Sequence, residues 1–236
     1  MKEETTNNSS KSSSRVLFTK DFSSRVHSLL NTKPYLAFEL LIIFAGTPLI
    51  FYLGLVPLPE LVTLAIITIV MSIWLFGFAR VERYRFDIRL KSETIRGILI
   101  RFAFAATVLT GVVLLIEPEH FLYLVLDTPY RWALFLLLYP LLSVIPQELI
   151  YRVFFFRRYR SLFTNKYLMV HVNALAFGFL HIIYGNFTAV FITYAIGYVF
   201  ARTYMRTRSF WAVCLEHTLY GLVIFTIGMG RYFINV

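Results

Sequence analysis

The chain has 236 residues, of which 58% are hydrophobic, 18% aromatic and only 15% charged. Soluble globular domains are closer to half apolar and a quarter charged, so this composition argues against a water-soluble protein. A lone cysteine, Cys214, excludes an internal disulfide and a cysteine-based metal site. The formal net charge of +10 would suit a nucleic-acid partner, unless the positions of the basic residues explain it otherwise.

The start of the chain differs from the rest. Residues 1–34 are rich in Ser, Asn, Thr and Lys, which is typical of a disordered or surface-lying segment. No apolar stretch of the kind found in signal peptides occurs there, so we expect no cleavable signal peptide. We predict a polar cytoplasmic tail over 1–34, a transmembrane hairpin with a basic cytoplasmic loop over 35–96, and a transmembrane core over 97–236.

Apolar runs follow the tail, each close to the roughly 20 residues that a helix needs to cross a bilayer. They cover about residues 36–56, 61–79, 97–116, 132–156, 167–184, 187–205 and 210–229. We therefore predict an all-α, polytopic transmembrane helical bundle of about seven spans.

The Lys and Arg residues alternate between the connections of these spans. The tail and the second, fourth and sixth connections carry six, six, four and three of them. The other connections and the C-terminus carry only Arg131 and Arg231, and two further arginines lie within spans. The positive-inside rule then places the N-terminus in the cytoplasm and the C-terminus on the periplasmic or extracellular side. Because anionic lipid headgroups explain the basic charge, we expect the lipid bilayer as a partner and no nucleic acid.

The fourth predicted span contains Gln147, Glu148 and Arg152. Ionisable side chains at membrane depth are rare and usually functional. Glu148 and Arg152 are four residues apart, so they share a helix face and can pair. Pairing favours the charged carboxylate while burial favours the neutral one, which makes Glu148 a candidate general base beside the kink expected at Pro146. The alternative is an ion pair that only ties two helices together.

The fifth and seventh spans contribute two histidines. A single buried histidine such as His181 is more often a structural hydrogen-bond donor than a catalyst. Glu216 and His217 point about 100° apart on a helix, so at most one faces a given cavity. We favour His217 for the site and expect Glu216 to pair with Arg101. Counted from the basic helix ends, Glu148 and His217 lie roughly 13 Å deep, which predicts a site in the cytoplasmic half, reached from that side.

Three motifs together resemble those of the CAAX-protease and bacteriocin-processing (CPBP) family of intramembrane endopeptidases, over about residues 95–230. In chain order they are Gln147-Glu148 with Arg152, Phe177 with His181, and His217. The resemblance implies a helical membrane bundle that hydrolyses peptide bonds with an activated water. Its substrates would be prenylated proteins or bacterial peptides. It also implies that Glu148 and His181 hold the water, that Arg152 sets the charge of the acidic site, and that His217 donates to the oxyanion.

Two positions depart from the family pattern. The family commonly has Glu-Glu, with the first glutamate as the base, where this chain has Gln147. Gln147 cannot accept a proton from water, so either Glu148 takes that role through a distorted helix or the site is inactive. The third family motif often continues His-x-x-x-Asn, and Gly221 stands at that position here. The chain therefore resembles a divergent branch.

Three other interpretations stay open. His181, His217 and Glu148 would match a two-histidine, one-carboxylate zinc set, although the His-Glu-x-x-His signature is absent and we expect no cofactor. The chain could be an inactive member that binds peptides as an immunity or scaffold protein. Two histidines could also ligate haem in an electron carrier. We predict an endopeptidase of a bacterial inner membrane that acts on a peptide or protein substrate.

Overall fold

The computed structural model describes residues 28–78 and 83–233. The structure is 85% helical, and these two ranges contain no strand, which confirms the predicted all-α class. Most of the predicted tail, residues 1–27, lies outside the described residues, as do residues 79–82 in the basic loop.

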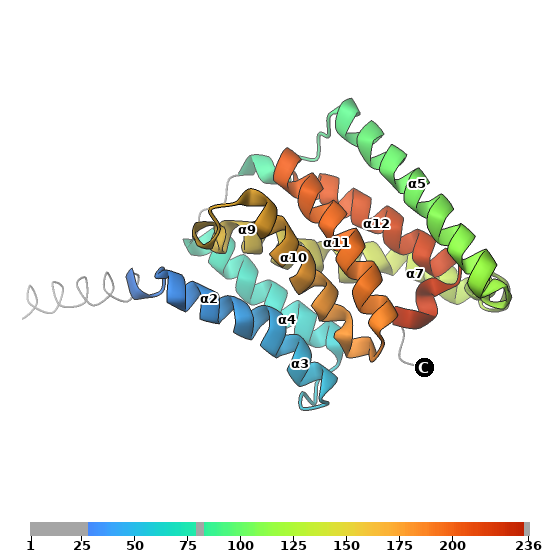
Figure 1. Cartoon of the computed structure of the whole chain (residues 1–236), viewed down its shortest axis with the longest axis horizontal. Helices are drawn as coiled ribbons and strands as arrows, with labels where there is room; N and C mark the ends of the chain where they lie inside the picture. Colours follow the sequence, from blue (N-terminus) through green and yellow to red (C-terminus); the bar gives the residue numbers. More distant parts are fainter. Residues whose placement is uncertain (1–27, 79–82, 234–236) are drawn as a thin grey trace, which may run out of the picture.

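Seven long helical segments follow one another through the described ranges, at the positions of the seven predicted apolar runs, with the short helix α6 (Tyr123–Asp127) between the third and the fourth (Figure 1). The first two are α2 (Lys33–Leu41) continued by η1 (Ile42–Gly46) and α3 (Thr47–Tyr52), and α4 (Glu60–Ile73) continued by η2 (Trp74–Phe78). The third is α5 (Ser92–Ile116). The fourth, called the long segment below, joins α7 (Pro129–Tyr139), η5 (Pro140–Val144), α8 (Ile145–Glu148), η6 (Leu149–Phe154) and α9 (Phe155–Arg158). The last three are α10 (Lys166–Leu180) with the 3₁₀ turn η8 (His181–Tyr184), α11 (Phe187–Thr207) and α12 (Phe210–Thr226).

Several of these helices are built to cross a membrane. Four are long and apolar enough by length and composition: Lys33–Tyr52, Ser92–Ile116, Pro129–Arg158 and Lys166–Tyr184. Two more, Val62–Gly77 and Phe210–Thr226, are apolar but shorter, and α11 has the length while mixing Thr and Tyr with its apolar residues. The chain is therefore a polytopic helical membrane protein.

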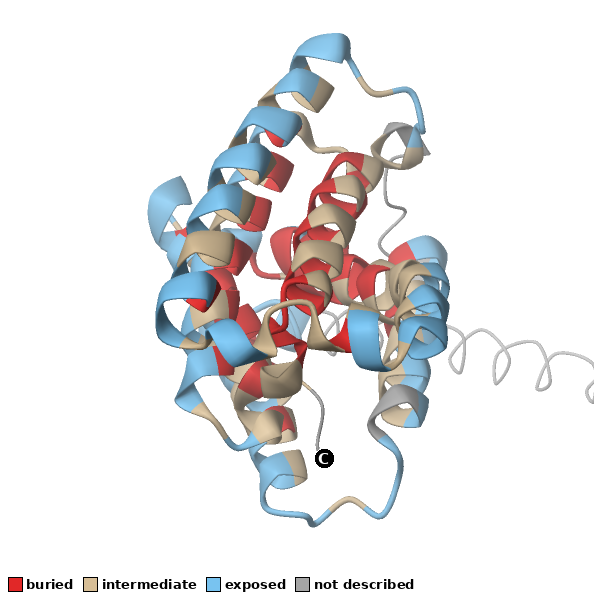
Figure 2. Cartoon of the chain, turned by 90° about the vertical axis from the view of Figure 1, so that its right-hand side faces the viewer, coloured by how far each residue is buried: buried red, intermediate tan, exposed pale blue. Residues whose placement is uncertain are grey.

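The buried core lies in the second half of the chain. Buried residues concentrate where the long segment, α10, α11 and α12 meet, whereas α5 lies at the edge with most of its surface exposed (Figures 1 and 2). α10 and α11 approach closely because two glycines face the partner helix. A Cβ on Gly178 would lie 2.9 Å from Tyr194 Cβ, and one on Gly197 would lie 2.7 Å from Phe177. These contacts bear out the close approach expected from small residues in membrane helices.

Hydrogen bonds tie the helix ends together on both sides of the bundle. On one side, Arg158 at the end of the long segment donates to Glu39 of α2 at 2.7 and 2.8 Å, and Tyr159 donates to the same carboxylate at 3.0 Å. Burial, reinforced by Glu39, raises the pKa of Tyr159, so its hydroxyl keeps the proton that it donates. On the other side, Tyr232 donates to Glu117 at 2.7 Å and accepts from Asn186 through its backbone carbonyl at 3.0 Å.

Candidate functional site

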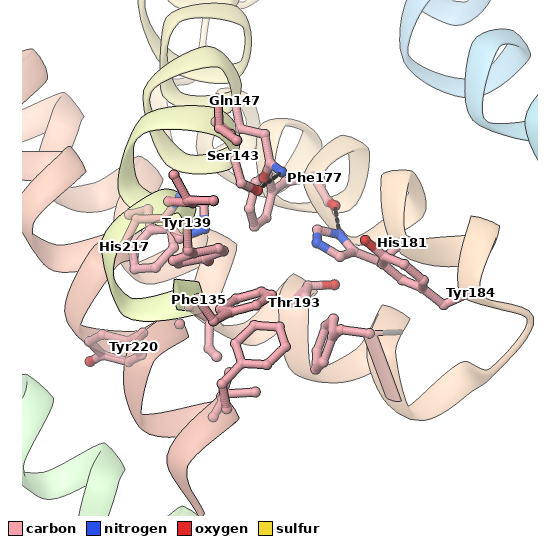
Figure 3. A pocket seen from close by; sticks show the side chains of 18 of the residues that line it. Phe135, Tyr139, Ser143, Gln147, Phe177, His181, Tyr184, Thr193, His217 and Tyr220 are labelled. Carbon is pink, nitrogen blue, oxygen red and sulfur yellow. Dashed lines mark hydrogen bonds between the residues drawn. The ribbon is translucent and has the colours of Figure 1, made fainter. Parts of the chain in front are cut away.

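A cavity of about 650 Å³ lies between the long segment, α10, α11 and α12 (Figure 3). Its polar lining includes Ser143, Gln147, His181, Thr193 and His217, and most of the rest is aromatic or aliphatic. Ligand sites in proteins commonly combine an apolar hollow with a few convergent polar groups. The cavity therefore brings together the helices that carry the three predicted motifs.

The helix that carries the first motif is irregular. Two π-helical stretches, η5 and η6, flank the single turn of α8 that contains Pro146, Gln147 and Glu148. Such π bulges rotate the following side chains and are frequent at functional sites. The distortion does not turn Glu148 into the cavity. Gln147 lines the cavity, while Glu148 is fully buried behind it.

Glu148 is held from two sides. One carboxylate oxygen lies 3.1 Å from Arg152 Nε, which confirms the predicted pairing, and the other lies 2.8 Å from His217 Nδ1. The side chains of Glu148 and Arg152 have no exposed surface. Arg152 also donates to Asn173 Oδ1 at 2.7 Å, and its guanidinium lies 4.9 Å from the centre of the Phe177 ring. This cluster joins the long segment to α10 and α12.

The two histidines lie on either side of Phe177. Its ring centre is 5.1 Å from that of His181 and 5.5 Å from that of His217, with edge-on geometry in both pairs (Figure 3). His181 Nδ1 lies 2.8 Å from the backbone oxygen of Phe177. Because a carbonyl only accepts, the proton of His181 is on Nδ1. The same reasoning applies to His217 Nδ1 against the Glu148 carboxylate, so Nε2 is the free acceptor of each neutral ring.

Gln147 has an incomplete set of hydrogen bonds. Its amide nitrogen donates to Ser143 Oγ at 2.8 Å. Its amide oxygen is buried and has no hydrogen-bond partner among the described residues. Buried polar atoms in native proteins nearly always have a partner, so this oxygen is suited to accept from a water or a peptide N–H inside the cavity.

Glu216 forms an ion pair away from the cavity. Arg101 of α5 donates to one of its oxygens through Nε at 2.9 Å and Nη2 at 2.8 Å, and Nη2 also reaches Thr203 Oγ1 at 3.1 Å. The side chain of Glu216 is buried and does not line the cavity. The expected pairing with Arg101 is therefore confirmed.

The sequence did not single out Tyr139. A Cβ placed on Gly221 would collide with the Tyr139 ring, so the glycine makes room for this side chain. Tyr139 lines the cavity beside His217, with ring centres 5.9 Å apart, and no hydrogen bond joins its hydroxyl to the described residues. In the sequence only Gly221 hints at this arrangement. A position without a side chain leaves room for a neighbouring residue but does not identify it.

The position of the cavity differs from the expected one. Its lining comes from the first part of the long segment, from the end of α10 with η8, from α11 as far as Phe200, and from the middle and second half of α12. All of these lie toward the side of the bundle opposite to the Arg158 end. The predicted access from the cytoplasm stays a prediction, because the lining residues show where the hollow lies but not the side from which it is reached. Counting depth along single helices could not show on which side of the site the hollow lies.

Within residues 28–78 and 83–233, no three His, Cys, Asp or Glu side chains gather as a group that could hold a metal ion. Glu148 and His217 are in contact, but His181 is bonded to its own helix instead.

The fold and the site define a helical membrane protein in which a buried carboxylate, guanidinium and imidazole cluster adjoins a cavity. Residues 129–223 match the family model described as type II CAAX prenyl endopeptidase Rce1-like. The matched region includes every predicted site residue and Gly221. The CPBP family predicted from the motifs is thereby confirmed over this region. No curated protein and no solved structure matches the chain.

Proposed function

We propose that the protein is an intramembrane endopeptidase in which His217 removes the proton from water and Glu148 acts through His217. The supporting observation is the 2.8 Å contact between Glu148 and His217 Nδ1, with the imidazole on the cavity wall. Rce1-like proteins are generally peptidases, which agrees with this assignment. We expect it in a bacterial inner membrane with a cytoplasmic N-terminus.

Charge balance supports His217 as the base. The negative charge of Glu148 and the positive charge of Arg152 compensate one another inside the protein. Because Nδ1 of His217 is directed at the Glu148 carboxylate, Nε2 is the ring atom left to accept a proton. When Nε2 accepts a proton, the carboxylate stabilises the imidazolium that forms, as the acidic member does in catalytic triads.

The reaction follows from these positions. The oxygen of a water attacks the scissile carbonyl carbon while its proton passes to His217 Nε2. The C–N bond then breaks, and the same proton passes to the leaving nitrogen, which gives a carboxyl end and an amine. His181 Nε2 accepts the second hydrogen of the attacking water and so fixes its direction. Glu148 and Arg152 position the imidazole and do not touch the substrate.

The developing oxyanion needs hydrogen-bond donors. His217 cannot supply one while it acts as the base, which changes the role that the family resemblance implied. The Tyr139 hydroxyl is beside His217 and occupies the space that a side chain at position 221 would need. We assign Tyr139 as the donor, with the Gln147 amide N–H as a second one. A donor of this kind typically contributes about 3–4 kcal/mol to lowering the barrier.

A non-catalytic peptide-binding protein is the second candidate, and Gln147 is the observation that favours it. The amide lines the cavity where the family commonly has an acid, and its oxygen is ready to accept from a peptide N–H. Such a protein would retain a peptide without cutting it.

The test compares the peptide termini in membranes of cells that express either the wild-type chain or His217→Ala. We expect new termini only with the wild-type chain. If equal amounts of correctly folded protein yield the same termini in both strains, hydrolysis at His217 is rejected. If neither strain yields new termini while wild-type protein co-purifies with a peptide, the binding candidate is supported instead.

A further inference from the structure

A second hollow, of about 1010 Å³, lies at the opposite ends of α10 and α11 and is called the basic pocket below. Its wall comes from the 3₁₀ turn η7 (Arg160–Leu162), from the start of α10 with the residues before it, and from the end of α11. Its described lining and that of the cavity containing His217 have no residue in common. The basic pocket is therefore a separate place in the fold, and the proposed peptidase reaction does not use it.

The wall of the basic pocket is strongly positive. Its five cations are Arg160, Lys166, Arg202, Arg206 and Arg208. The described wall contains no Asp or Glu that would compensate them. After residue 128 the chain has two acidic side chains, Glu148 and Glu216, and each is buried beside an arginine of its own. Because a hollow lined by charges of one sign concentrates their field, the pocket attracts an anion.

The helix dipoles do not explain the whole set of cations. Arg206 and Arg208 lie at the end of α11, where the dipole by itself favours positive charge. Lys166 is instead the first residue of α10, at the helix end that favours negative charge, and the first turn of α10 contains no acid. A bound anion would suit both the start of α10 and the cation that lies there.

The rest of the wall is partly apolar and includes Phe163, Met169 and Met205. Tyr167 and Leu168 on α10 are 54% and 53% exposed, and α10 belongs to a segment long and apolar enough to cross a membrane. A tyrosine at the start of such a helix is typical of the membrane–water interface. The basic pocket therefore lies at the level of the lipid headgroups. A ligand that carries both a phosphate and an apolar chain fits this wall better than free phosphate does.

We propose that the basic pocket binds the phosphate group of an anionic phospholipid. Arg202 and Arg206 are four residues apart and share a face of α11, so both guanidinium groups can donate to the phosphate oxygens. Lys166 supplies a compact positive charge from the start of α10. The acyl chains leave the pocket along Tyr167 and Leu168. Basic pockets between membrane-spanning helices bind such headgroups, and a lipid bound here joins the start of α10 to the end of α11.

The experiment counts the lipid molecules that the full chain retains, by native mass spectrometry from an uncharged detergent. Phosphatidylglycerol is titrated as the anionic probe. Phosphatidylcholine with the same acyl chains is the lipid probe without net charge, and inorganic phosphate at the same concentrations is the probe without an acyl chain. The measurement does not depend on whether the chain cleaves peptides.

Two double variants with the same net charge are compared. Arg202→Gln with Arg206→Gln removes two cations from the pocket, and both side chains are exposed, so the fold should not depend on them. Arg89→Gln with Arg96→Gln removes two exposed cations that do not line the pocket and is the matched control. Lys166→Gln alone tests the wall that α10 supplies.

We expect the wild-type chain and the control variant to retain phosphatidylglycerol with equal affinity and to bind phosphatidylcholine more weakly. The Arg202→Gln, Arg206→Gln variant should bind phosphatidylglycerol about 10- to 30-fold more weakly, and Lys166→Gln about 5-fold more weakly. Thermal unfolding of each variant verifies the fold. If the pocket double variant does not fold, Lys166→Gln decides: a loss supports the proposal and an unchanged affinity overturns it.

Three other results overturn the proposal. Equal weakening in the two double variants would mean that the net charge attracts the lipid and the pocket does not. Equal retention of phosphatidylcholine and phosphatidylglycerol would remove the selectivity for an anion. Release of the lipid by inorganic phosphate at the same concentration would assign the pocket to soluble phosphate instead of a phospholipid.

Discussion

Two buried carboxylates, Glu148 and Glu216, are each paired with an arginine, yet they lie in different surroundings. Glu148 contacts His217, and that imidazole lines the cavity. Glu216 is adjacent to His217 in the sequence, but it turns toward Arg101 and Thr203, away from the cavity. Burial and pairing alone therefore do not identify a functional acid. The contact to a group on the cavity wall distinguishes the two.

The largest effect is expected for His217→Ala. Removing the proposed base should lower the rate of cleavage by about 10³- to 10⁴-fold, the upper part of the range for general base catalysis. The protein should remain folded, because Glu148 keeps its ion pair with Arg152 when the imidazole is removed. A mass-spectrometric measurement of product, with circular dichroism as the control for folding, checks this. A variant that retains more than about a tenth of the rate would contradict the role given to His217.

Arg152→Met tests the Glu148 cluster by stability. The apolar side chain fills a similar volume but leaves the Glu148 carboxylate without its cation. Breaking a buried ion pair on one side typically costs about 3–5 kcal/mol, so a clear drop in the unfolding temperature is expected in detergent. Arg101→Met should have a smaller effect, because 39% of the Arg101 side chain is exposed while that of Arg152 is fully buried. Equal drops in the unfolding temperature of the two variants would contradict the expectation that the Glu148 pair depends more strongly on its arginine than the Glu216 pair does.

Tyr139→Phe removes one hydroxyl from the cavity and keeps the ring against Gly221. If the hydroxyl stabilises the oxyanion, the turnover number should fall by about 10²- to 10³-fold with little change in substrate affinity. A matched change at Tyr220→Phe, which also lines the cavity, should leave turnover nearly unchanged. An effect confined to KM would assign Tyr139 to binding alone.

Glu216→Gln should produce the smallest effect on cleavage. The amide loses the charge-assisted contacts to Arg101, so we expect a loss of about 1.5–3 kcal/mol in the free energy of unfolding. Cleavage per folded molecule should stay at the wild-type level. Thermal unfolding and product formation measured on the same preparation separate the two quantities.

Both ion pairs could be predicted from the sequence, one from helix spacing and the other by elimination. Glu148 and Arg152 share a helix face by their spacing, and Arg101 and Glu216 remained as the other charges within spans. The alternation of apolar runs and basic connections likewise predicted the helical segments.

The orientation of Gln147 and Glu148 could not be predicted in the same way. It depends on the π-helical stretches on both sides of α8, and no residue pattern in the sequence fixes where these occur. Tyr139 and the position of the cavity depend on tertiary packing between helices far apart in the chain. For these features the sequence supplies the residues but not their distances.

The most direct test of the account is to measure cleavage by Glu148→Gln beside Glu216→Gln, each relative to wild type and per folded molecule. Glutamine at position 148 keeps the volume of the side chain and removes the charge that supports His217. The account predicts that Glu216→Gln yields the wild-type set of new peptide termini and that Glu148→Gln yields almost none. Equal cleavage by both variants would contradict the claim that Glu148 acts through His217.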